Sequence, residues 1–206
     1  MLGFAYCELT AYYGDCVLNK GMTLDEAYVA TRSPKNEVLA YAFECLDKAA
    51  EYLPNSYKGQ QRPTKGAALG FKARFALFHE DWQTAVDAAQ KCMDLGVYKL
   101  HDNYREMFQA TSSPEFMFYF KGDLTLKKGY GFMENVRDFV IRKIGGHCNQ
   151  SPSLELFCSY TCTDGLPIDK SPLYNPKDPF ANRDPRLAMT IQPFKTKYSA
   201  DYAEYE

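Results

Sequence analysis

Apolar residues recur every three or four positions along the first half of the chain, which is the spacing of one face of an α-helix. The pattern predicts helices over residues 1–13, 34–53, 64–78 and 82–95. The first segment carries a single charged residue, Glu8, and ends at Gly14, a residue type that readily adopts the left-handed conformation found at helix ends. Each of these helices is expected to pack against another.

The predicted helix over residues 34–53 starts with recognisable capping signals. Ser33 is the expected N-cap, Pro34 the first helical residue, and Glu37 lies in the first turn, where the helix dipole favours a carboxylate. The apolar positions of this helix form one stripe: Val38, Leu39, Ala42, Leu46, Ala49 and Leu53. The stripe is the expected contact with a neighbouring helix.

The segments over residues 64–78 and 82–95 are expected to form an antiparallel hairpin, joined by the short polar turn "HED". Small residues in the first of the two helices allow them to approach closely. The single tryptophan, Trp82, is expected to fold over these small residues, and Gly96 is expected to cap the second helix. The hairpin is similar to a tetratricopeptide (TPR) repeat, except that Glu80 replaces the usual glycine of the turn.

Beyond the hairpin the pattern changes. The run "SPEFMFYFKGD" is aromatic and typical of a strand, and the glycine-rich segment after it indicates loops. Aromatic rings on loops can stack on the C–H faces of sugars, while nearby polar groups bind the hydroxyls. The predicted ligand contacts are therefore Tyr130, Phe132, Arg137, Arg142 and Asn149. The alternative is that the two rings are buried in loop packing.

Composition narrows the possible classes of function. The chain of 206 residues has 24 Lys and Arg against 26 Asp and Glu, and no basic run suits a nucleic-acid backbone. Its seven cysteines are neither dense nor even in number, which argues against a disulfide framework. No phosphate-binding loop, dinucleotide fingerprint or nucleophile elbow occurs in the sequence. We therefore predict no cofactor and no enzymatic activity.

Aspartates in the last third of the chain suggest a glycoside hydrolase as a further possibility, because such enzymes use paired carboxylates. The pairs are Asp164 with Asp169 and Asp178 with Asp184. These segments are rich in Pro and Gly, where Asp commonly caps turns, and the flanking Arg183 and Arg186 should lower the pKa of Asp184. Neither pair is predicted to be catalytic.

The same region contains residue types that bind metals, without a standard arrangement. The spacing of His147, Cys148, Cys158 and Cys162 matches no zinc module. A calcium loop needs a terminal bidentate Glu, which is missing after Asp178, Asn182 and Asp184. We predict no metal site.

Several segments follow one another in a characteristic order. They are "YYGD", "ATRSPKNEVLAYAFECLDKAAEYLP", "RPTKGAALGFKARFALFHEDWQTAVDAAQKCMDLGVYKL", "NYREMF", "PEFMFYF", "SPSLELFCSYTCTDGLPI" and "PFANRDPRLAMTI". Their order and spacing resemble the SusD/RagB family over roughly residues 4–194. The resemblance implies an internal fragment, because that family also has a lipidated N-terminal cysteine, an earlier helical region and a long C-terminal part.

The resemblance implies a mainly α fold, with TPR-like helical hairpins followed by a loop-rich region with little β structure. Residues 1–206 would form a single incomplete domain, with a helical scaffold over 1–112 and a ligand-side region over 113–206.

Members of the family resemble surface-exposed outer-membrane lipoproteins of Bacteroidetes that bind a nutrient, most often a glycan. They pass it to a TonB-dependent SusC-like transporter. The implied partners of this chain are therefore a glycan and such a transporter, with membrane attachment only through a lipid anchor outside the chain. A TPR-like protein-interaction module that binds no sugar is the alternative, and the identity of the ligand, glycan or peptide, stays open.

Overall fold

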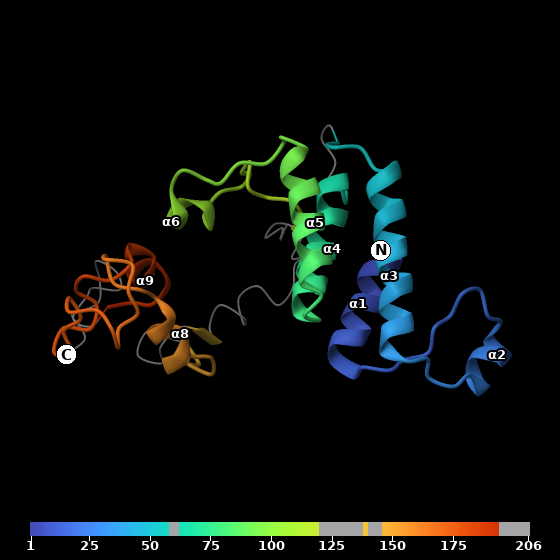
Figure 1. The fold of residues 1–206 in the computed structure, drawn as a ribbon, viewed down its shortest axis with the longest axis horizontal. Coiled ribbons are helices and arrows are strands. Elements are labelled where there is room, and N and C mark those ends of the chain that lie inside the picture. The colour runs from blue at the N-terminus through green and yellow to red at the C-terminus, as the bar shows by residue number, and fades with distance from the viewer. Residues whose placement is uncertain (58–61, 120–137, 140–145, 194–206) are drawn as a thin grey trace. The chain divides into compact units, whose positions relative to one another are not determined.

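The computed structural model describes residues 1–57, 62–119, 138–139 and 146–193. Helices dominate these ranges (Figure 1). The β structure that they contain consists of two isolated bridges, Cys16 with Ser33 and Cys162 with Arg183. The predicted mainly α fold with little β structure is therefore confirmed. No helix in the described ranges is both long and apolar enough to cross a membrane.

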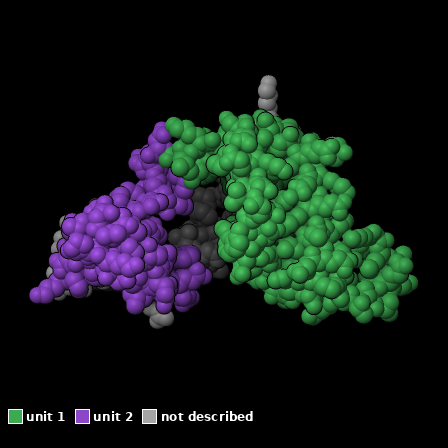
Figure 2. Space-filling model, viewed as in Figure 1, with its two compact units in different colours: residues 1–101, 111–119 green, residues 102–110, 120–206 purple. Residues whose placement is uncertain are grey.

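The chain divides into two compact units, coloured separately in Figure 2. The first unit contains residues 1–101 and 111–119, and the second contains residues 102–110 and 120–206.

The first unit is a set of packed helices. Its helices are α1 (Leu2–Tyr13), α2 (Leu24–Val29), α3 (Lys35–Tyr52), α4 (Lys65–Phe78) and α5 (Trp82–Asp94). Helix α1 packs on α3, α3 packs on α4, and α4 packs on α5 (Figure 1). The four helices expected from the apolar pattern are therefore present, and α1 ends at Gly14 with a positive φ of 69°, as predicted.

The core of this unit lies between α1, α3 and α4. It consists of Tyr6, Cys7, Leu18, Val38, Ala42, Leu46 and Phe75. Val38, Ala42 and Leu46 belong to the apolar stripe predicted for α3. Gly3 lets α1 approach α3 closely, since a Cβ atom at this position would lie 2.7 Å from the Ala42 carbonyl oxygen.

The start of α3 differs from the prediction by one residue. Pro34, not Ser33, is the N-cap, and it makes no side-chain capping hydrogen bond. The Ser33 amide instead donates a hydrogen bond to the Cys16 carbonyl (2.9 Å), and the Lys35 amide donates to the Asp15 carboxylate (2.8 Å). These contacts close the loop before α3, so a long-range backbone pairing replaces the expected local cap.

Helix α2 lies within that loop and was not predicted. It begins with a capping box, in which the Thr23 hydroxyl accepts from the Glu26 amide and the Glu26 carboxylate accepts from the Thr23 amide. This signal is visible in the sequence, but the helix is short and none of its residues is buried.

The α4–α5 hairpin forms as predicted, but Trp82 does not close it. The Trp82 side chain is 61% exposed. The small residues Gly66 and Gly70 instead face the Tyr98 ring and the Met117 side chain, which leaves no room for the tryptophan. Residue Glu80, with a φ of 62°, occupies the left-handed turn position that glycine usually takes.

The segment "SPEFMFY" does not form the expected strand. The Phe116 amide donates to the Ser113 carbonyl (3.1 Å), which makes a turn. The Phe118 ring packs against Phe71 of α4, with centroids 5.5 Å apart. Tertiary packing of the aromatic rings explains this segment without β-pairing. The rest of the run, residues 120–123, lies outside the described ranges.

The described part of the second unit is built from short helices and turns, as expected for a loop-rich region. The helices are α6 (Tyr104–Met107), α8 (Leu154–Ser159) and α9 (Pro185–Thr190), and α6 packs on α9. Leu187 of α9 is 1% exposed and is among the buried residues of this unit.

Candidate functional site

Four of the five predicted ligand contacts lie outside the described residues: Tyr130, Phe132, Arg137 and Arg142. The fifth, Asn149, is exposed. Its side-chain amide donates to the Asp138 carboxylate (3.0 Å), and the Gln150 amide donates to the Asp138 carbonyl (3.1 Å). Asn149 thus has a local partner, and its role in ligand binding stays a prediction.

Asp164 is part of a tight turn. Its carboxylate accepts hydrogen bonds from the Ser171 hydroxyl (2.7 Å) and the Leu166 amide (3.0 Å). These bonds hold the pKa of Asp164 below its usual value. Gly165, with a φ of 79°, provides the backbone conformation of the turn. This carboxylate stabilises the turn and is poorly suited to act as a general acid.

Asp184 caps α9 and forms an ion pair. It accepts from the Arg186 amide (2.9 Å) and from Arg186 Nε (3.0 Å), and Arg186 Nη2 forms a second, short bond to Oδ2. Arg186 therefore lowers the pKa of Asp184, as predicted from the sequence. The other flanking arginine, Arg183, makes no ion pair with Asp184, because its guanidinium donates to the backbone carbonyls of Phe157, Tyr160 and Pro179.

The Arg186 side chain is 60% exposed and lies near two tyrosines. Asp184 is the main group that raises the pKa of Arg186, and Tyr104 of α6 and Tyr160 act in the same direction. The Tyr160 hydroxyl donates to Thr190 Oγ1 (3.0 Å), which in turn donates to the Arg186 carbonyl (2.9 Å). Hydroxyl groups, a carboxylate and a guanidinium therefore gather on one surface of the second unit.

Aromatic rings lie beside these polar groups. The Tyr104 and Phe108 rings meet edge to face, with centroids 5.3 Å apart and an interplanar angle of 79°. Tyr104 is 37% exposed and Phe108 is 69% exposed. We call the set Tyr104, Phe108, Tyr160, Asp184, Arg186 and Thr190 the Arg186 cluster. Exposed rings next to hydrogen-bonding groups of fixed geometry are suited to a ligand with both apolar and hydroxylated faces.

Sequence reasoning missed the Arg186 cluster as a site. Its members lie in "NYREMF", "SPSLELFCSYTCTDGLPI" and "PFANRDPRLAMTI". The sequence indicated the interaction of Asp184 with Arg186, but not that the six residues come together. The four-residue spacing of Tyr104 and Phe108 on one helical face is the local signal for the ring pair. No local signal joins α6 to α9, because the two segments are about eighty residues apart.

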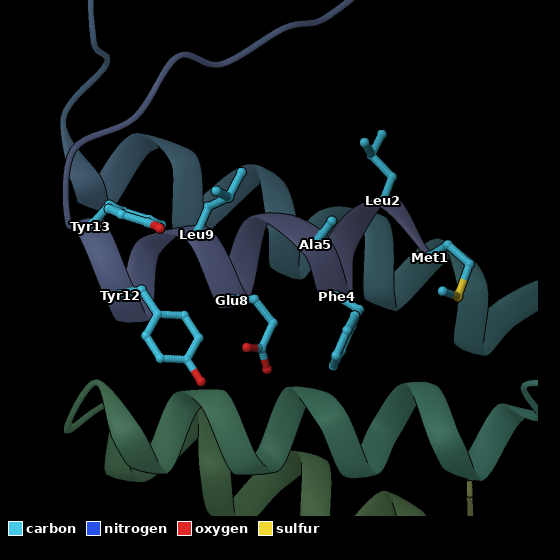
Figure 3. A pocket seen from close by; sticks show the side chains of 8 residues that line it. All are labelled: Met1, Leu2, Phe4, Ala5, Glu8, Leu9, Tyr12 and Tyr13. Atoms are coloured by element: carbon cyan, nitrogen blue, oxygen red, sulfur yellow. The ribbon is translucent and has the colours of Figure 1, made fainter. Parts of the chain in front are cut away.

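A second surface feature is an open hollow of about 720 Å³ along α1 in the first unit (Figure 3). It is lined by Met1, Leu2, Phe4, Ala5, Glu8, Leu9, Tyr12 and Tyr13. Phe4, Glu8 and Tyr12 point toward α4, while Leu2 points away from it (Figure 3). Glu8 is the only charged residue in this lining, so few groups are available to bind sugar hydroxyls. The chemistry of the hollow is typical of a helix-packing surface.

Metal ligands do not gather in the part of the chain that the structure describes. No group of three or more His, Cys, Asp or Glu side chains is arranged there to hold an ion. Cys162 is buried, whereas Cys148 is exposed.

Solved structures of similar fold were found. A SusD-like carbohydrate-binding protein from Bacteroides fragilis is 27% identical, with a TM-score of 0.77 over 95% of this chain and 39% of its own length. A SusD-like protein from the same species is 24% identical, with a TM-score of 0.71 over 91% of this chain and 40% of its own. A SusD superfamily protein from Bacteroides vulgatus is 21% identical, with a TM-score of 0.62 over 81% of this chain and 36% of its own.

This chain thus spans about two fifths of the length of the first two of these proteins. A scan against protein-family models gave no match, and a search of curated proteins found no relative.

Proposed function

We propose that this chain, which is related to the SusD/RagB family, binds carbohydrate at the bacterial cell surface as part of a SusC/SusD-type nutrient uptake system. The observation that carries the proposal is the similarity to the SusD-like carbohydrate-binding protein, at 27% identity and a TM-score of 0.77 over 95% of the chain. The predicted relationship to this family is thereby supported at the level of fold and sequence together.

Binding of this kind requires no chemical step. A largely preformed surface of rings, hydroxyls and charged groups captures an oligosaccharide, with modest affinity because both partners exchange well-hydrated surfaces. The aspartates that were weighed as possible hydrolytic carboxylates, and not predicted to be catalytic, are consistent with binding alone. Asp164 is engaged in a turn and Asp184 in an ion pair, and both have lowered pKa values, whereas a glycosidase general acid needs a raised one.

Attachment to the membrane and transfer of the ligand to a transporter are proposed from the resemblance to the family. A lipid anchor would attach the protein to the outer membrane, and a TonB-dependent SusC-like transporter would receive the bound glycan. The predicted contacts Tyr130, Phe132, Arg137, Arg142 and Asn149 remain part of this proposal.

The experiment that tests the function is a glycan-array screen of the 206-residue chain, with reducing-sugar release followed on every hit. Binding without release is the expected result. Release of reducing ends would identify a hydrolase instead, and silence across neutral and acidic glycans would overturn carbohydrate binding by this chain.

A protein-interaction module is the second candidate, and the apolar hollow along α1 is the observation that favours it. A surface with a single charged residue is better matched to an apolar helix than to a sugar. The substitution Leu9→Glu on α1 would then leave glycan binding unchanged and lower the affinity for a helical protein partner.

A further inference from the structure

We propose that the Arg186 cluster is a carbohydrate-binding site for uncharged pyranose sugars. The inference rests on the proposed function and extends it, because it assigns a site and a class of sugar to described residues of the second unit.

The rings provide the apolar half of the site. Phe108, at 69% exposed, is one of the more exposed large apolar residues of this unit, and its contact with Tyr104 fixes its orientation. Tyr104 is the first residue of the single-turn helix α6 and Phe108 is its C-cap, and α6 packs on α9, which carries Arg186. A pyranose ring stacked on either aromatic face would therefore place its hydroxyls beside α9.

The ion pair provides the polar half. Asp184 binds Arg186 through Nε and Nη2, which orients the planar guanidinium. No hydrogen bond joins Nη1 of Arg186 to another described residue, so its two N–H groups can donate to a ligand. Both Asp184 oxygens already accept from Arg186, so the exposed N–H groups of Arg186 are the donors that face sugar hydroxyls. The arrangement is preformed, so little ordering is needed on binding.

The balance of charge selects the class of sugar. The positive charge of Arg186 is compensated by the Asp184 carboxylate, and the hydrogen bonds from Arg186 lower the pKa of Asp184. A uronate or sulfated sugar would meet a charge-neutral pair, and would therefore gain less attraction than from an uncompensated arginine. Uncharged hexopyranoses are therefore the expected ligands.

The test uses the 206-residue chain and isothermal titration with maltohexaose, cellohexaose, mannohexaose and, as the acidic probe, hexagalacturonic acid. We expect at least one neutral oligosaccharide to bind more tightly than the acidic one. Substitutions Tyr104→Ala, Phe108→Ala and Arg186→Gln should each weaken that binding at least about fivefold, which corresponds to roughly 1 kcal/mol. Thermal unfolding of each variant separates lost contacts from lost folding.

Tyr28→Ala is the matched control, because Tyr28 is an 85% exposed tyrosine on α2 of the other unit. This variant should bind sugar as tightly as the original chain does. If the cluster variants retain full affinity while a glycan still binds, the site assignment is wrong and the proposed function stands. If the acidic probe binds most tightly, the sugar class is wrong. If the unmodified chain binds none of the array glycans, both the site and the proposed function fail.

Discussion

The Arg183 guanidinium lies over the Phe157 ring, with 4.8 Å between its central carbon and the ring centroid, and Nη2 donates to the Phe157 carbonyl at 2.7 Å. One residue thus holds both the ring and the backbone at the end of α8. The same guanidinium also lies 5.6 Å from the Tyr174 ring centroid and donates to the Tyr160 and Pro179 carbonyls. Arg183 is 5% exposed, and we infer that it organises the loops of the second unit.

Replacing Arg183 by lysine should therefore destabilise the second unit. A lysine ammonium cannot reach three carbonyls in a planar fork or stack flat on two rings, so a loss of about 2–3 kcal/mol in the free energy of unfolding is expected. Urea unfolding followed by near-UV circular dichroism measures it. Arg74→Lys, at an exposed position of α4, is the control. Equal stability of the two variants would show that the buried guanidinium is not needed.

Replacing Gly3 by alanine should separate α1 from α3. The added Cβ would lie 2.7 Å from the Ala42 carbonyl oxygen and 2.9 Å from Leu46 Cγ, and backbone cannot yield as easily as a side-chain tip. Overpacking costs about 1–3 kcal/mol, which outweighs the gain in helix propensity of up to about 1 kcal/mol. Thermal unfolding should show a lower Tm. A rise in Tm would mean that the two helices are not in close contact.

Replacing Trp82 by alanine should change stability by less than about 1 kcal/mol, because its side chain is 61% exposed. Phe75→Ala provides the comparison, since Phe75 is 5% exposed in the core and its loss should cost about 3–5 kcal/mol. Both changes in the free energy of unfolding are measured by urea unfolding, with a signal that reports on the first unit. A large loss with Trp82→Ala would restore the interpretation of this residue as the closure of the hairpin.

The charged form of the Asp164 carboxylate should stabilise the protein, so its contribution should be lost in strongly acidic solution. Its hydrogen bonds to Ser171 and Leu166 lower its pKa below the ordinary 3.8, so its stabilisation is complete above that value and lost as pH falls through the folded-state pKa. Asp164→Asn should therefore be less stable than the original chain at pH 7, and the difference should shrink below pH 3.8. The measurement is the unfolding midpoint as a function of pH. A difference that does not change with pH would contradict the role of the charged form.

The positions of α1, α3, α4 and α5 could be derived from the sequence because their causes are local. The apolar spacing in α3 and the stop at Gly14 each depend on residues within a few positions of one another. The ion pair of Asp184 with Arg186 was also predictable, since the two residues are two positions apart.

Contacts between distant segments were decided by the tertiary structure. Tyr98 and Met117 take the place expected for Trp82, and the bridge between Cys16 and Ser33 holds the chain just before α3, which starts one residue later than predicted. Likewise, the Arg186 cluster exists only because α6 packs on α9. Many side chains of suitable size compete for the same apolar space, and the hydrophobic effect has no direction, so the sequence determines which faces must be covered while the fold determines which residues cover them.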